Sequence, residues 1–436
     1  MRMLLICFFL LSVTLSLVNG GAINPDLYPE DIWPSNRSIP YAFHANFTHE
    51  KGHSMIQWVI EEIERNSCLR FQLLNETDEF EANNESSFIQ FHKNGHLGSS
   101  SVLGKYENRT TDVRLSYRFI LYRGYWVVFH EIFHALGLLH TQDRVDRDNY
   151  VFVNDTNSSI FMNFEDSSDF GIPYDFGSVM HYPKIPGEMT PLNDLYAQTM
   201  GSSSNIPAFT DYLLLNRLYR CEERCAAIHT VCENGGFVNP NDCQRCICPN
   251  GFGGAFCGHP VRRPYGANGS TCGGVFYATD SWQNLSLEIR FDGNPICTYC
   301  VWHLEASIGR RLEVRLLEVG PSRYCYQDWE GWMEIQLENL DLRGYRFVCN
   351  KQLPKGILRS DGRRALVSLY NNDLWVKTKM VKLEFRSVAE ERQKTTEMPP
   401  EIISTELPAV DHNSSDCRSI SGIFAAVVAL MMFLFF

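Results

Sequence analysis

Three histidines and one glutamate lie within a single short segment, HEIFHALGLLH, at residues 130–140. His130 and His134 are four residues apart, so on a helix they share one face and can direct two imidazole nitrogens at one metal ion about 2 Å away. Glu131 lies beside them, where it could take a proton from a metal-bound water. The pattern predicts a catalytic metal site, and the ligand types favour zinc.

The third histidine needs a change in chain direction. Gly137 tolerates a positive φ, so the helix can end there and the chain can turn. His140 can then reach the same metal, and three protein ligands leave one position for water, which is typical of catalytic zinc. A bare His-Glu-x-x-His pattern could also be a solvated helix face, but the glycine and third histidine argue against that interpretation.

A second motif, SVMHYP, follows at residues 178–183. A tight turn that carries a methionine beneath the zinc is the second mark of the metzincin class of proteases. Together, HEIFHALGLLHTQDRVDRDNYV at 130–151 and YDFGSVMHYP at 174–183 resemble the astacin family of zinc metalloendopeptidases. The resemblance extends from IPYAF at residue 39 to the cysteine of LYRC at residue 221.

The resemblance to astacins implies roles for single residues. It implies one Zn²⁺ per catalytic domain, held by His130, His134 and His140. Tyr182 would be an extra ligand that leaves the metal during turnover and steadies the tetrahedral intermediate. Met180 would form the hydrophobic floor of the site. His181 is expected at the surface or in a hydrogen bond, without binding metal.

These features predict a secreted or cell-surface zinc metalloendopeptidase. It would hydrolyse peptide bonds of extracellular proteins with a zinc-activated water and Glu131 as general base. The alternative is a catalytically inactive surface adhesion protein that binds partners through its downstream modules. The formal charge of −12 argues against nucleic acid as a partner. Thr141 departs from the family pattern, which usually places a glutamate after the third histidine.

The expected fold of residues 22–221 is the α+β fold of the metzincins. Ile56, Val59, Ile60 and Ile63 recur at helical spacing and predict an amphipathic helix with a core-facing stripe. Residues 87–91 and 114–119 alternate between polar and apolar types, which predicts strands. The active-site helix is expected over residues 125–138, where the sequence is too hydrophobic for a surface helix.

A cysteine-rich module is expected at residues 222–258. Its six cysteines allow fifteen pairings, and a zinc knuckle of Cys243, Cys246 and Cys248 is a weaker alternative because the compartment is expected to be oxidising. CENGGFVNPNDCQRCICPNGFGGAFC resembles an EGF-like domain. The resemblances to EGF-like domains and to astacins imply disulfides Cys225–Cys243, Cys232–Cys246, Cys248–Cys257 and Cys68–Cys221.

Residues 272–388 alternate between strand-like runs and turns, which predicts an all-β sandwich. Examples are LEIRF, RRLEVRLLEV, WMEIQL, ALVSLY and VKLEF. The cysteine pattern and CVWHLEA resemble a CUB domain, which implies disulfides Cys272–Cys300 and Cys325–Cys349 and leaves Cys297 open. The aromatic cluster of Tyr324, Tyr326, Trp329 and Trp332 could bind a partner, although packing within the sandwich is the favoured interpretation.

The two ends of the chain predict export from the cell. Residues 1–20 resemble a secretory signal peptide, residues 389–412 a disordered stalk, and residues 413–436 a GPI-anchor signal, favoured over a short membrane span. Substrates would therefore be extracellular proteins or peptides. Ten sequons fit the secretory pathway and predict N-glycosylation: Asn36, Asn46, Asn75, Asn84, Asn108, Asn154, Asn157, Asn268, Asn284 and Asn413.

Overall fold

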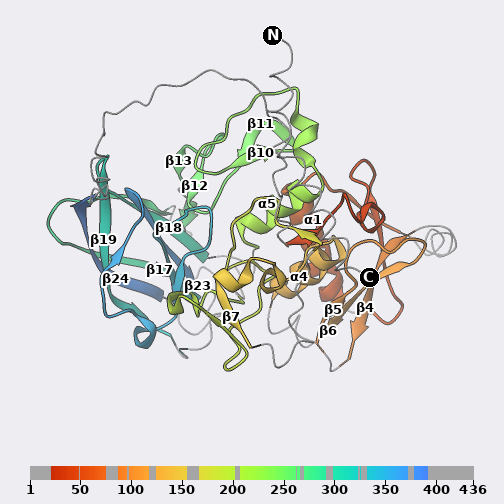
Figure 1. The fold of residues 1–436 in the computed structure, drawn as a ribbon, viewed down its shortest axis with the longest axis horizontal. Coiled ribbons are helices and arrows are strands. Elements are labelled where there is room, and N and C mark those ends of the chain that lie inside the picture. Colours follow the sequence, from red (N-terminus) through yellow and green to blue (C-terminus); the bar gives the residue numbers. More distant parts are fainter. Residues whose placement is uncertain are drawn as a thin grey trace, which may run out of the picture. The chain divides into compact units, whose positions relative to one another are not determined.

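The computed structural model (Figure 1) describes residues 21–48, 50–74, 87–95, 98–116, 124–154, 166–201, 207–261, 263–265, 270–290, 298–322, 325, 331–371 and 378–390. All of them belong to one unit, Met1–Glu390. The expected signal peptide, stalk and anchor signal lie outside the described residues. Within the described residues, every helix is too short or too polar to span a membrane.

A five-stranded mixed sheet packs against the helix that carries His130 and His134, and its strand order is β3-β2-β4-β6-β5. Strands β3, β2, β4 and β6 run parallel to their neighbours, and the short β5 is antiparallel to β6. Apolar side chains from β4 and β6 enter the core, because alternate residues of a strand point to one face. The strands are β2 (Ile39–Phe43), β3 (Phe71–Leu73), β4 (Phe88–Asn94), β5 (Ser100–Ser101) and β6 (Thr110–Ser116).

Two helices share the hydrophobic core of this sheet. Helix α1 (Glu50–Arg65) buries Met55, Ile56, Val59, Ile60 and Ile63, so the predicted apolar stripe faces the core. Helix α4 (Tyr125–Ala135) is buried along most of its length and contacts both α1 and β6. A helix this apolar is stable only inside the protein, and its burial fixes the histidines that it carries.

The C-terminal helix α5 (Phe209–Leu218) joins the same core through Tyr212, Leu215 and Leu218. Two short antiparallel pairs complete this part of the chain: β1 (Ala22–Ile23) with β8 (Ser167–Ser168), and β7 (Val151–Val153) with β9 (Met189–Pro191). Short 3₁₀ helices lie at Pro29–Asp31, Thr141–Asp143, Arg147–Asn149, Asp194–Tyr196, Cys221–Cys225 and Asn350–Gln352.

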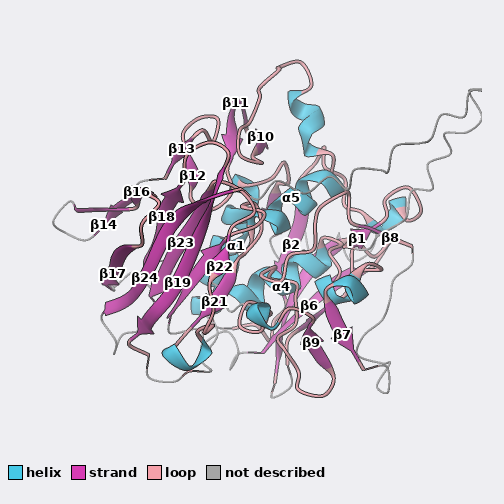
Figure 2. Cartoon of the chain, turned by 60° about the vertical axis from the view of Figure 1, so that its left-hand side comes forward, coloured by secondary structure: helices cyan, strands magenta, loops and turns pink. Residues whose placement is uncertain are grey.

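Residues 222–390 contain strands and only short 3₁₀ helices in the described part. The cysteine-rich module has small antiparallel pairs, and the sandwich that follows has a five-stranded sheet, β16-β18-β23-β20-β21, and a four-stranded sheet, β17-β24-β19-β22. In Figure 2 the long strands of both sheets appear as magenta arrows with similar slopes. The module has β10 (Phe237–Asn239), β11 (Asp242–Ile247) and β12 (Phe252–Gly253), and β13 (His259–Pro260), β14 (Arg263–Tyr265) and β15 (Ser270–Cys272) follow it. The sandwich has β16 (Gly274–Tyr277), β17 (Gln283–Arg290), β18 (Thr298–Glu305), β19 (Arg310–Gly320), β20 (Gly331–Gln336), β21 (Tyr345–Phe347), β22 (Leu358–Arg359), β23 (Arg364–Asn371) and β24 (Thr378–Ala389).

The observed element boundaries differ from the expected ones at several places. The active-site helix ends at Ala135 rather than at residue 138, because Leu136 already leaves helical geometry and Gly137 has φ of +95°. Strand β6 begins at Thr110, four residues before the expected start, because the polar Thr110 and Asp112 pair with β4 along with the apolar residues.

The sandwich core holds Met333 and Ile335 of the expected strand WMEIQL, and Trp332 is buried against Tyr370. The other three members of its aromatic cluster lie outside the described residues.

The structure joins twelve cysteines in six disulfides. They are the pairs that the resemblances imply: Cys68–Cys221, Cys225–Cys243, Cys232–Cys246, Cys248–Cys257, Cys272–Cys300 and Cys325–Cys349. Cys297 lies outside the described residues, as do the sequons Asn75, Asn84, Asn157, Asn268 and Asn413. Asn36, Asn46, Asn108 and Asn284 are exposed and Asn154 is half-buried, so glycosylation stays a prediction that their accessibility permits.

Loss of the Cys68–Cys221 bridge is expected to destabilise the N-terminal domain. The bridge joins positions 153 residues apart, and a crosslink over a long loop restricts the unfolded chain strongly. We expect the Cys68→Ser, Cys221→Ser double variant to lose about 2–5 kcal/mol of unfolding free energy. Chemical denaturation checks this value, with the Cys248→Ser, Cys257→Ser variant as control, since that bridge lies in the cysteine-rich module. An unchanged midpoint in the first variant would contradict the expectation.

Candidate metal centre

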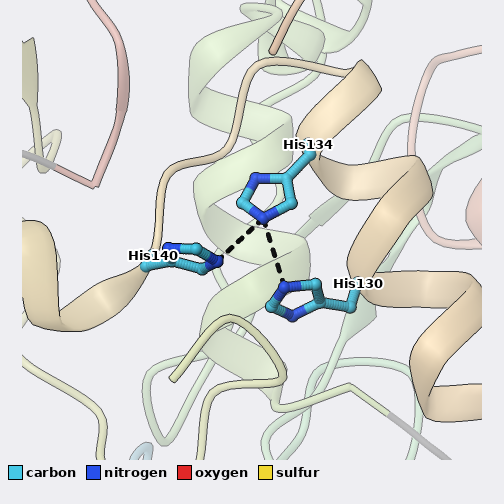
Figure 3. A group of neighbouring side chains, drawn as sticks. All are labelled: His130, His134 and His140. Carbon is cyan, nitrogen blue, oxygen red and sulfur yellow. Dashed lines mark hydrogen bonds between the residues drawn. The ribbon is translucent and has the colours of Figure 1, made fainter. Parts of the chain in front are cut away.

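Helix α4 places His130, Glu131 and His134 on consecutive turns in the core. His130 is 8% exposed and Glu131 is 5% exposed, whereas His134 is half-buried. Both histidines project from the same face of the helix, as their spacing predicts (Figure 3). The helix therefore supplies two imidazoles and one carboxyl group at a buried position.

The chain turns sharply after α4 and brings the third histidine back. The Gly137 nitrogen donates to the His134 carbonyl (2.8 Å), and the Leu138 nitrogen donates to the Phe133 carbonyl (2.9 Å), so the turn closes on the end of the helix. Strand β1 holds the following residues, because the Ile23 nitrogen donates to the Gly137 carbonyl (2.9 Å). Strand β1, which lies more than 100 residues before the histidine motif, thus fixes the turn at Gly137.

The three imidazoles meet through their Nε2 atoms. Nε2 of His134 lies 3.1 Å from Nε2 of His130 and 3.0 Å from Nε2 of His140, as the dashed lines of Figure 3 mark. Among the described residues, these three form the group of histidine, cysteine or acidic side chains that could hold a metal. Tetrahedral ligands about 2.05 Å from one zinc ion are about 3.3 Å apart, so the observed spacing fits zinc.

The Nδ1 atoms identify which nitrogens are free to bind. His130 Nδ1 lies 2.8 Å from the Val179 carbonyl and His134 Nδ1 lies 2.8 Å from the Leu138 carbonyl. A carbonyl only accepts, so each Nδ1 carries the proton and each Nε2 presents a lone pair. His140 Nδ1 faces the Asp143 carboxylate at 3.2 Å. Lone pairs that face each other repel, and a cation between them removes that repulsion, so the donor set fits a metal ion.

Burial also keeps the ligands in the neutral state that binds metal. It lowers the pKa of His130 to about 3, with a further contribution from His140. Burial lowers the pKa of His134 well below its usual value, and His130 and His140 add to that effect. Neutral imidazole is the form that coordinates zinc, so these two side chains need no deprotonation at neutral pH.

Glu131 lies in an environment suited to a general base. Burial raises the pKa of its carboxyl group to about 8. A divalent cation at the neighbouring histidines would favour the ionised form and lower that pKa. The carboxyl group would then take up and release a proton near neutral pH, which is what general acid–base catalysis requires.

The methionine turn lies directly against the histidines. Met180 is buried, and its carbonyl accepts from the Thr141 nitrogen at 3.1 Å. The preceding residue, Val179, provides the carbonyl that orients His130. The turn therefore contacts the site through two backbone carbonyls, in addition to the side chain of Met180.

Tyr182 lies against His140, whereas His181 is outside the group of side chains that could hold a metal. The Tyr182 ring centroid lies 4.4 Å from that of His140. His181 is 3% exposed, so the expectation of a surface position is wrong, whereas that of a hydrogen bond is met: its Nε2 lies 2.7 Å from the Tyr174 hydroxyl. Its Nδ1 lies 2.7 Å from the Tyr182 carbonyl, so His181 supports the backbone of its neighbour.

Asp211, which the sequence pattern did not single out, holds the methionine turn from α5. Its carboxylate accepts from the Ser178 hydroxyl (2.5 Å), the Val179 nitrogen (2.9 Å) and the Ala208 nitrogen (2.8 Å). It is 2% exposed, and burial raises its pKa to about 7. An aspartate in the first turn of an apolar helix was the only sequence signal, and that signal by itself indicates capping.

Replacement of Asp211 by asparagine is expected to change how stability depends on pH. The pKa of this carboxyl group rises from 3.8 to about 7 on folding, so the folded wild type binds more protons and loses stability as pH rises between those values. As the pH rises from 5 to 8, we expect the unfolding free energy of Asp211→Asn to increase by about 2–3 kcal/mol relative to that of wild type. Urea denaturation of both proteins checks this, since histidine contributions cancel in the difference. Parallel pH curves would contradict it.

Comparison with known proteins agrees with this geometry. The family model described as Astacin, a peptidase family, matches residues 26–220. The chain is 34% identical over 303 residues to Zinc metalloproteinase nas-25 of Caenorhabditis elegans, covering 65% of this chain and 69% of that protein. It is 32% identical over 264 residues to Zinc metalloproteinase nas-29 of the same organism, covering 57% of this chain and 48% of that protein. The chain thus spans about half the length of some relatives.

Two solved structures are also similar to parts of the chain. High choriolytic enzyme 1, a hatching enzyme zinc-protease from Oryzias latipes, is 25% identical with a TM-score of 0.36, covering 42% of this chain and 89% of that one. The CUB1-EGF-CUB2 domains of rat MASP-1 are 13% identical with a TM-score of 0.20, covering 28% of this chain and 47% of that one. Both TM-scores are low, so the assignment depends on the sequence matches and the site. On those grounds the chain belongs to the astacin family of zinc metalloendopeptidases.

Proposed function

We propose that this chain cleaves internal peptide bonds of extracellular proteins, with Glu131 as general base and His130, His134 and His140 as the zinc ligands. The convergence of three Nε2 lone pairs beside a buried carboxyl group is the observation that supports the proposal. When bound, zinc lowers the pKa of a coordinated water to about 7 and polarises the substrate carbonyl.

Glu131 and Tyr182 would move or hold protons during the reaction. Glu131 would accept the proton of the attacking water at a carboxylate oxygen and deliver it to the leaving amine. Burial raises the pKa of Tyr182, with further contributions from Asp143 and Glu131, so its hydroxyl keeps its proton. A neutral phenol at that position can donate a hydrogen bond to the carbonyl oxygen as negative charge develops there.

The downstream modules are proposed as an EGF-like domain at residues 222–258 and a CUB domain at residues 272–388, after a protease domain at residues 22–221. Three short-range disulfides within the first module and two in the second support this division. Such modules could bind protein partners. Disulfides of this density are typical of the oxidising secretory pathway, which supports an extracellular location, whether secreted or tethered.

The adhesion-only alternative receives no support from the site. An inactive protein has no requirement for three convergent imidazoles and a buried carboxyl group next to them in the sequence, yet this chain brings the imidazoles together and buries Glu131 on the same helix. The enzyme is therefore the single function proposed.

Zinc content and proteolysis of the protein secreted from a eukaryotic host test the proposal. We expect one zinc per chain and cleavage of casein or gelatin at internal bonds, inhibited by 1,10-phenanthroline. The Glu131→Ala variant, made in parallel, should contain zinc and cleave neither substrate. Metal-free protein that is inert towards every polypeptide, or equal cleavage by the variant, would overturn the proposal.

A further inference from the structure

A turn of the C-terminal sandwich packs against the methionine turn of the protease domain. The turn, residues 340–344, lies between β20 and β21, and its Arg343 is 7% exposed. The backbone nitrogen of Arg343 donates to Asp175 Oδ1 (3.3 Å), and Nη2 of its side chain donates to the Pro207 carbonyl (3.4 Å). Both acceptors belong to the protease domain, so one sandwich residue reaches two of its segments.

The contact is close at the aliphatic part of the Arg343 side chain. A Cβ atom at Gly177 would overlap Cβ and Cγ of Arg343, so glycine is required there for the side chain to pass. Beside it, Thr199 is fully buried and its hydroxyl donates to the Gly344 carbonyl at 2.8 Å. These groups exclude water, and hydrogen bonds lost in such an environment leave unsatisfied polar groups.

Asp175 connects this contact to the methionine turn. Its Oδ1 also accepts from the Gly177 nitrogen (2.8 Å), and its Oδ2 accepts from the Thr210 hydroxyl (2.6 Å). The Ser178 nitrogen donates to the Asp175 carbonyl (3.3 Å). The carboxylate therefore fixes the backbone immediately before Val179, whose carbonyl orients His130.

The charge of Arg343 suits this position. Burial alone would lower its pKa, but Glu334, Asp175 and Asp211 raise it, so the guanidinium stays protonated. Two of these carboxylates, Asp175 and Asp211, are the groups that hold the methionine turn. Burial raises the pKa of Asp175, and the fixed cation of Arg343 beside it offsets part of that rise.

We propose that the Arg343 side chain is a positioning group for the zinc site: by packing on Gly177 and placing its charge beside Asp175 it fixes the methionine turn, and through the Val179 carbonyl it fixes the imidazole of His130. The inference rests on the proposed zinc-dependent function. It makes the sandwich part of the catalytic unit, so that a domain far along the chain determines how firmly the metal is held.

The test compares Arg343→Ala and Arg343→Lys with wild type in the full-length protein. Measurements are kcat, KM and the rate at which zinc passes to a chelating dye. For Arg343→Ala we expect kcat to fall and zinc release to accelerate, each about tenfold, with KM little changed, because groups that orient ligands have effects of that order. Arg343→Lys keeps the charge and the aliphatic contact with Gly177, so it should recover most of both losses.

Two further variants separate positioning from general stability. Arg359→Ala removes an exposed arginine of the sandwich that pairs with Glu313 (2.9 Å), and it should match wild type in kcat and zinc release. Gly177→Ala disrupts the same contact from the protease side, and it should show the same fall in kcat and the same faster zinc release. It therefore tests the inference even if Arg343→Ala fails to fold. Wild-type zinc release in Gly177→Ala or Arg343→Ala would overturn the inference. A wild type that lacks zinc and activity would instead contradict the proposed function.

Discussion

Replacing Glu131 with glutamine is expected to leave one zinc bound and to lower kcat about 10³-fold, within the range for loss of a general base. Glutamine has nearly the same shape, so the packing around this buried position and the three imidazoles stay in place. An amide cannot accept the proton of the attacking water. The loss should appear in kcat rather than in KM, because the base acts in the transition state.

Peptide cleavage kinetics together with zinc analysis check this expectation. Glu61→Gln is the matched control, since Glu61 is an exposed residue of α1 outside the metal-binding group, and it should behave as wild type. If Glu131→Gln kept near wild-type kcat with a full complement of zinc, Glu131 would not be the base.

Replacing His134 with alanine is expected to remove zinc from the protein. Nε2 of His134 lies within 3.1 Å of both other Nε2 atoms, so His134 is the central ligand of the three. Two remaining imidazoles cannot complete the three-ligand set of a catalytic zinc site. We expect zinc affinity to fall by more than about 10²-fold, beyond the loss caused by removing an outer partner of a ligand.

Competition with a chelator of known affinity measures this change. His44→Ala is the control, because His44 lies outside the group that could hold a metal, and its zinc affinity should be unchanged. Activity of His134→Ala should return only at high zinc, if at all. A variant with wild-type zinc affinity would show that the metal is bound elsewhere.

The parts of the site that depend on local spacing could be predicted from the sequence. His130 and His134 share a face because four residues nearly complete a helical turn, and Gly137 permits a positive φ that few other residues adopt. The apolar stripe of α1 was predictable for the same reason. Each of these features is set within one element by its own residues.

The supports of the site could not be predicted, because they come from segments far apart in sequence. The Val179 carbonyl, the Asp211 carboxylate and strand β1 meet the histidine segment only after the chain has folded. An aspartate or a backbone carbonyl carries no distinctive sequence pattern. His181 is expected from the sequence either at the surface or in a hydrogen bond, and its partner Tyr174 is identified only by the packing around the turn.

The location of the metal tests the central claim most directly. Crystals of the zinc-loaded protein, with diffraction measured on both sides of the zinc absorption edge, would place the ion without assumptions about ligands. We expect one anomalous peak about 2.0–2.1 Å from Nε2 of His130, His134 and His140, with Glu131 nearby but not coordinated. A peak at other residues, or Glu131 as a ligand in place of one histidine, would contradict it.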